Sequence, residues 1–156
     1  MKSTRNRSVE HGAFTIERTY DAAPERVFAA FAQKEAKARW FGTEEGWAVT
    51  EWELDFREGG RERHVSHEQK GGPGFRLDVE YLDIVEGERI VYSYVMHIGD
   101  DKLSVSLTTL EFAKQGSRTQ LKLTEHGAFF DGHDQVRKRE AGTQALLDVL
   151  GKALSG

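Results

Sequence analysis

The chain has 156 residues, no cysteine and a formal net charge of −4. This length fits one ordinary domain, and the absence of cysteine excludes disulfide frameworks, thiolate metal sites and cysteine nucleophiles. The negative net charge disfavours binding along a phosphate backbone, so we predict no nucleic-acid partner.

The first residues of the chain are polar. No apolar segment follows Met1–Arg7 to form a secretory signal, and no apolar run approaches the length of a bilayer-spanning helix. We therefore expect a cytoplasmic protein without a membrane span. Residues 1–12 are predicted to form a flexible tail, and residues 13–156 a single domain.

A strand and two short helices are the first predicted elements. Phe14–Tyr20 alternates apolar and polar residues, which is typical of a strand. Pro24 suits the first position of a helix, and Glu25 lies near the positive end of that helix. A second short helix is predicted over Lys34–Trp40, and Gly42 ends it.

The middle of the chain alternates with a period of two. This pattern predicts about six further strands joined by hairpins, and therefore a mainly antiparallel sheet. The alternating segments begin at Trp47, Arg61, Phe75, Ile90, Leu103 and Thr119. In the segment that begins at Leu103, the side chains of Leu103, Val105 and Leu107 are predicted to share one face.

The last segment has helical periodicity. Asp134 is a suitable N-cap, and an apolar stripe follows it. The stripe consists of Val136, Gly142, Leu146, Leu147, Val149, Leu150, Ala153 and Leu154. One long helix must bury this stripe on the sheet, which predicts an α+β fold. In this fold a curved sheet wraps around the helix and leaves a cavity between them.

Six segments resemble a known family. They are Phe14–Arg18, Pro24–Phe28, Ala38–Gly42, Asp55–Arg61, Leu121–Gly127 and Glu140–Leu150. Their order and sequence are similar to the activator-of-heat-shock-protein-90-ATPase homologue family, part of the SRPBCC/START-like superfamily. The resemblance implies a helix-grip fold with a hydrophobic tunnel, usually without a known cofactor, and it does not imply catalysis. Relatives often carry tryptophan after the glycine of the last helix, where this chain has Thr143. A smaller, polar residue there enlarges the pocket or changes its polarity.

Aromatic residues are spread over several of the predicted elements. Core packing explains each of these residues alone. Together they favour the wall of a pocket that contains some water, because the tyrosine hydroxyls need hydrogen-bond partners that a dry core would not supply. The predicted ligand-binding residues are Trp40, Trp52, Phe56, Phe75, Tyr81, Tyr92, Tyr94, Met96, Leu107, Glu125 and Leu146. The predicted ligand is a small hydrophobic or amphipathic molecule.

Glu125 falls on the same predicted face as Leu121 and Leu123. Partial burial would raise the pKa of its carboxyl, so it is a candidate general base or ligand acceptor. A salt bridge with Arg63, or an exposed strand end, is the simpler explanation. Arg63 and His64 lie on opposite faces of their strand, and the sequence leaves open which of them points inward.

Histidines do not form a recognisable metal motif. His64 and His67 are three residues apart, which puts them on opposite faces of a strand. A site with His97 or His126 from a neighbouring strand is an alternative, but scattered surface histidines explain the pattern more simply. We predict no catalytic residue, no metal and no cofactor.

Two other functions stay open beside ligand binding. One is a cyclase- or hydrolase-type enzyme in which Glu125 is the base and Tyr92 or Tyr94 the acid. The other is a co-chaperone-like interaction domain with a role in the stress response, as the family name suggests. A chaperone and a second copy of the chain, as a homodimer, are the macromolecular partners that the sequence leaves open.

Overall fold

The structure is a computed structural model that describes residues 7–155. Ten helices and strands follow one another in this part of the chain. They are β1 (Val9–Tyr20), α1 (Pro24–Ala32), α2 (Lys34–Lys37), β2 (Trp47–Leu54), β3 (Arg61–Glu68), β4 (Phe75–Val85), β5 (Arg89–Ile98), β6 (Asp101–Gln115), β7 (Arg118–Phe130) and α3 (Val136–Ser155).

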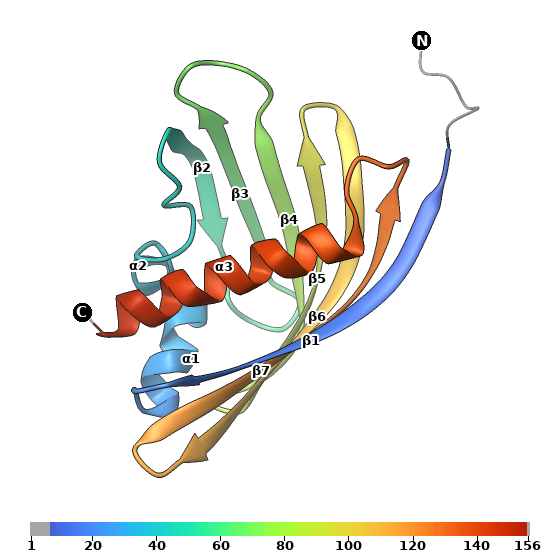
Figure 1. Ribbon diagram of the computed structural model, residues 1–156. Coiled ribbons are helices and arrows are strands. Elements are labelled where there is room, and N and C mark those ends of the chain that lie inside the picture. Colours follow the sequence, from blue (N-terminus) through green and yellow to red (C-terminus); the bar gives the residue numbers. More distant parts are fainter. Residues whose placement is uncertain (1–6, 156) are drawn as a thin grey trace.

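The seven strands within residues 7–155 form one antiparallel sheet in the order β1-β7-β6-β5-β4-β3-β2. The sheet curls, and α3 crosses its concave side (Figure 1). The pair α1 and α2 lies near one end of α3, between β1 and β2 along the chain. This is the predicted helix-grip arrangement, in which one long helix covers a sheet too wide for it to fill.

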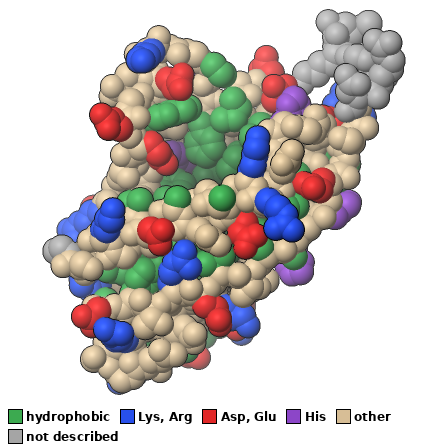
Figure 2. Space-filling model, viewed as in Figure 1, with side chains coloured by type: hydrophobic (Ala, Val, Ile, Leu, Met, Phe, Trp, Pro, Cys, Tyr) green, Lys and Arg blue, Asp and Glu red, His purple; other side chains and the backbone are tan. Residues whose placement is uncertain are grey.

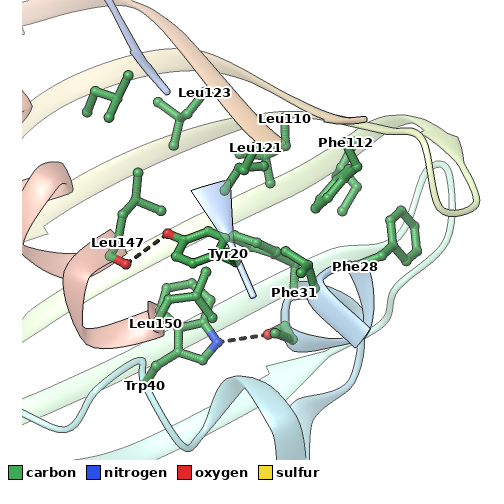
Figure 3. Packing of buried hydrophobic residues seen from close by; sticks show 14 of the residues in the cluster. Tyr20, Phe28, Phe31, Trp40, Leu110, Phe112, Leu121, Leu123, Leu147 and Leu150 are labelled. Carbon is green, nitrogen blue, oxygen red and sulfur yellow. Dashed lines mark hydrogen bonds between the residues drawn. The ribbon is translucent and has the colours of Figure 1, made fainter. Parts of the chain in front are cut away.

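The core joins α3 and α1 to the sheet. Leu110, Leu121 and Leu150 are fully buried there (Figure 3). The Tyr20 hydroxyl donates a hydrogen bond of 2.8 Å to the Leu147 carbonyl, which attaches β1 to α3. The indole nitrogen of Trp40 donates a bond of 2.9 Å to the carbonyl of Ala30 in α1. These bonds satisfy two polar groups inside an otherwise apolar core.

Two element boundaries differ from the predictions by more than two residues. β1 begins at Val9 rather than Phe14. It includes residues 9–12, which we assigned to a tail; residues 1–6 of that tail lie outside the described residues, and the single domain over 13–156 stays a prediction. α2 ends at Lys37, before the predicted Trp40, because the chain continues as a turn. Gly42 follows with a φ of +75°, a conformation that favours glycine.

The face assignment of β6 is wrong in its first half. Ser104 pairs with Met96 while Lys102 pairs with His97, so Leu103 is an extra residue in a β-bulge. The bulge shifts the alternation by one residue. Val105 and Leu107 therefore point outward, with 39% and 42% of their surface exposed, while Ser104, Ser106 and Thr108 are buried.

The apolar stripe of α3 is also narrower than predicted. Leu147, Leu150 and Leu154 are buried, but Val149 is 37% exposed and lies on the outer side of the helix. A charged residue, Arg139, occupies the buried face one helical turn before Thr143. The first half of α3 thus packs a cation against the sheet, and the second half buries leucines.

Candidate functional site

A cavity of about 450 Å³ lies between α3 and the concave side of the sheet. Its wall comes from α1, α2 and the turn after α2, from the strands β2 to β7, and from α3. Figure 2 shows hydrophobic side chains inside the hollow that opens beside α3. The cavity is where the sequence predicts it, because α3 covers only part of the curved sheet.

Most of the predicted site residues line this cavity. They are Trp40, Phe75, Tyr81, Tyr92, Tyr94, Met96, Glu125 and Leu146. The pairing of β4 with β5 is regular from Phe75 to Tyr81. Tyr81 therefore lies next to Tyr92, with ring centroids 5.9 Å apart, and Tyr92 lies next to Tyr94, at 6.0 Å. Two adjacent strands thus give the cavity a continuous aromatic wall.

Three predicted residues do not line the cavity. Leu107 points away from it, as the bulge in β6 requires. Phe56 packs edge-to-face between Phe28 and Tyr81, at 5.8 and 5.0 Å, and belongs to the core. Trp52 lies behind the wall, where its ring packs against His64 at 4.8 Å. For these three residues the prediction is wrong.

Glu125 is buried and partnered on several sides. Its carboxylate accepts hydrogen bonds from the Tyr94 hydroxyl at 2.7 Å and from the Thr108 hydroxyl at 3.3 Å. Arg139 forms an ion pair with it at 3.5 Å and donates a 2.6 Å bond to the Tyr94 hydroxyl oxygen. Burial and the negative charge of Glu125 raise the pKa of Tyr94 well above its usual value. Tyr94 therefore keeps its proton at neutral pH.

The partner of Glu125 is not the predicted one. Arg63 is exposed and forms ion pairs with Glu51 at 2.8 Å and Asp78 at 3.5 Å on the outer face. Arg139 takes the place that we assigned to Arg63. It also donates bonds of 2.7 Å to Ser104, which the bulge in β6 turns inward, and of 2.8 Å to Asp134.

Glu62 forms a second buried cluster at the β3 side of the cavity. Its carboxylate pairs with Lys37 at 2.8 Å and accepts bonds from the Tyr81 hydroxyl at 2.7 Å and the Trp52 indole at 2.8 Å. Burial alone would raise the pKa of Glu62, but the Lys37 charge and these bonds outweigh it and lower the pKa. Glu62 is therefore a carboxylate with a fixed set of donors.

His64, not Arg63, is the inward side chain of β3. Only 2% of His64 is exposed, and neither ring nitrogen has a hydrogen-bond partner within residues 7–155. Burial lowers its pKa to about 4, with a smaller opposing effect of Glu62. The imidazole is therefore neutral at physiological pH, with one nitrogen as donor and the other as acceptor.

Sequence reasoning singled out Glu125 and Tyr94 but missed Arg139, and it missed the Glu62 cluster as a whole. Arg139 lies eight residues before Leu147 and eleven before Leu150, so a charge on the apolar face of α3 was a readable signal. For Glu62 no such signal exists, because the residues on both sides of it are arginines. Lys37 lies in a helix of four residues and His64 beside a single valine, so neither position shows a periodic pattern.

The described residues offer neither a metal cluster nor a membrane span. Among residues 7–155 no three histidine, aspartate or glutamate side chains are grouped so as to hold a metal ion. His67, which we considered as a ligand, lies 3.1 Å from the Thr50 hydroxyl. No helix in the described part of the chain is long and apolar enough to cross a bilayer.

Comparison with known proteins gives family and structural matches. Residues 21–155 match the family model described as Activator of Hsp90 ATPase homolog 1-like protein. The crystal structure of the Mll3558 protein from Rhizobium loti is 48% identical with a TM-score of 0.86, over 94% of this chain and 99% of that one. A Rhizobium leguminosarum protein is 38% identical with a TM-score of 0.89, over 96% and 97%.

More distant structures support the fold alone. The AHSA1-like protein from Aeromonas hydrophila is 23% identical with a TM-score of 0.71, over 92% of each chain. No curated protein matches the sequence.

Proposed function

The chain belongs to the Activator of Hsp90 ATPase homolog 1-like family, and from this premise we propose that it binds a small hydrophobic or amphipathic molecule between α3 and the sheet. The observation that carries the proposal is the cavity of about 450 Å³ with its aromatic wall. Small-molecule sites are concave, mostly apolar and of this size, with a few fixed polar groups. The Glu62 and Glu125 clusters are such polar groups.

An enzyme is the second candidate, and one contact favours it. Glu125 and the Tyr94 hydroxyl are 2.7 Å apart, within reach of each other for proton transfer. Two features favour binding over catalysis. The raised pKa makes Tyr94 a weak acid, and the Arg139 ion pair holds the Glu125 carboxylate in a fixed set of contacts. Chaperone binding, a homodimer and a cytoplasmic location stay predictions.

The test uses two tryptophan substitutions on adjacent residues of α3. Thr143 lines the cavity, whereas Gln144 is exposed and does not. Thr143→Trp places an indole in the hollow, and Gln144→Trp adds the same group outside it. The probes are naphthalene, which is rigid and apolar, and 1-decanol, which is flexible and amphipathic.

We expect at least one probe to bind the wild type and to raise its melting temperature, since a ligand of the native state stabilises it. Thr143→Trp should weaken this binding by about tenfold or more, which corresponds to the loss of about 1.4 kcal/mol of contacts. Gln144→Trp should bind as the wild type does. If neither probe binds, or if both variants bind equally well, the cavity is not the binding site.

A further inference from the structure

His64 is a buried polar side chain on the cavity wall that lacks a partner. It stands between Glu62 and Ser66 on the inward face of β3, and all three line the cavity. No group in the part of the chain that the structure describes donates to or accepts from either of its ring nitrogens. Such groups are rare in native proteins, and each one indicates a missing partner or a functional role.

Aromatic rings hold the imidazole in place without giving it a hydrogen bond. The ring centroids of Phe41, Trp52 and Phe75 lie 4.9, 4.8 and 6.3 Å from that of His64, in edge-to-face contacts. Carbon rings at these angles fix the plane of the imidazole. They are no substitute for a hydroxyl or carbonyl partner.

The carboxylate on the same face of β3 is already engaged. The Glu62 carboxylate accepts from Lys37, Tyr81 and Trp52. Gly42 is the other neighbour: a Cβ at this residue would lie 2.8 Å from the Nε2 atom of His64. The wall therefore brings backbone, not a hydrogen-bonding side chain, to this edge of the imidazole.

Charge on the wall limits what can bind. The cavity contains the buried or half-buried carboxylates of Glu62, Glu125 and Asp134, and its buried cations, Lys37 and Arg139, are ion-paired with them. Two further lining charges, Glu44 and Lys138, have opposite signs and are exposed, so solvent screens them. Any anion would meet these carboxylates without a free buried cation among the described residues. A neutral polar group meets no such penalty.

Resting on the proposed function, we infer that the ligand is a neutral aromatic alcohol or phenol whose hydroxyl forms a hydrogen bond with a ring nitrogen of His64. Because the neutral imidazole offers one donor and one acceptor, a hydroxyl suits either tautomer. The aromatic part of the ligand then packs on the rings of β4 and β5.

Three probes of one shape test this inference. Naphthalene has no polar group, 2-naphthol has a neutral hydroxyl, and 2-naphthoate has an anionic group. Each is titrated calorimetrically into the wild type and into His64→Phe, and the ratio of the naphthalene and 2-naphthol dissociation constants is compared between the two proteins. The two probes differ in hydrophobicity, but this difference is the same for both proteins and cancels when the two ratios are compared.

We expect His64→Phe to reduce the preference for 2-naphthol by about tenfold, as for one buried hydrogen bond. In the wild type 2-naphthoate should bind more weakly than 2-naphthol. His64→Leu, which has a shorter side chain, gives the same comparison if the phenyl ring does not fit. In the wild type, 2-naphthol but not naphthalene should shift the His64 ring ¹⁵N resonances.

The outcomes separate the two proposals. If naphthalene and 2-naphthol bind the wild type but their ratio is unchanged in both His64 variants, this inference is overturned and the proposed function stands. Equal or tighter binding of 2-naphthoate also overturns it. If none of the probes binds the wild type, both proposals fail.

Discussion

Removing the positive charge of Arg139 tests how the Glu125 cluster is stabilised. Arg139 and Glu125 have only 7% and 3% of their side-chain surface exposed, so solvent does little to screen their interaction. Arg139→Met keeps a long apolar side chain but deletes the donors to Tyr94, Ser104 and Asp134. Glu125 then stays buried without its cation.

The expected loss lies at the lower end of the range for broken buried ion pairs. Deleting one partner of such a pair costs about 3–5 kcal/mol, because an uncompensated charge remains. Here the carboxylate keeps its bonds from Tyr94 and Thr108. We therefore expect Arg139→Met to lower the free energy of unfolding by about 3 kcal/mol.

Urea unfolding followed by circular dichroism measures this loss, with the m-values compared to check that unfolding stays two-state. The control is the double variant Glu125→Gln/Arg139→Met, which removes both charges. It should be more stable than Arg139→Met alone by about 1–2 kcal/mol. A loss below about 1 kcal/mol in Arg139→Met would refute the reasoning, and so would a double variant that is no more stable than Arg139→Met.

Three further predictions concern His64, Gly42 and the two faces of the fold. Burial lowers the pKa of His64 to about 4, so between about pH 6.5 and pH 4 the unfolded chain binds a proton at His64 that the folded chain does not. The contribution of His64 to the free energy of unfolding is therefore fully present above about pH 6.5, and about 3 kcal/mol is lost as the pH falls to 4. His64→Phe should lack this part of the pH dependence in denaturant titrations, and an unchanged profile would contradict it. Gly42→Ala should cost about 1–3 kcal/mol in the same assay, since φ is +75° and its Cβ would press on His64; a neutral effect would disprove that contact. Leu150→Ala should cost about 2–5 kcal/mol, whereas Leu107→Ala on the outer face should stay within about 0.5 kcal/mol; similar losses would contradict the faces assigned to these two residues.

The fold follows from local patterns that are clear in the sequence. In β4 and β7, apolar residues alternate with polar or charged ones, so the inward faces with Leu77, Val79, Leu121 and Leu123 could be identified before the structure. The inward position of Glu125 follows from the same alternation. Once these faces and one long amphipathic helix are known, few arrangements bury both.

The parts that could not be predicted depend on tertiary contacts. The bulge at Leu103 arises in the pairing of β6 with β5, and no residue of β6 indicates it in the sequence. In β3, charged or polar residues occupy both faces from Arg61 to His64, so the alternation did not show which face of the strand points inward. Lys37 of α2 and Glu62 of β3 form their ion pair across 25 residues of sequence, which is a contact between distant segments.

Met96 offers the most direct measurement of ligand binding in the cavity. It lines the cavity wall, and Met1 is the only other methionine of the sequence. In protein labelled with ¹³C at the methionine methyl groups, titration with 2-naphthol or naphthalene should move the Met96 resonance in a saturable way and leave Met1 in place. Thr143→Trp should reduce this response. A Met96 resonance that stays unchanged while a probe binds elsewhere, or while no probe binds, would contradict a ligand site between α3 and the sheet.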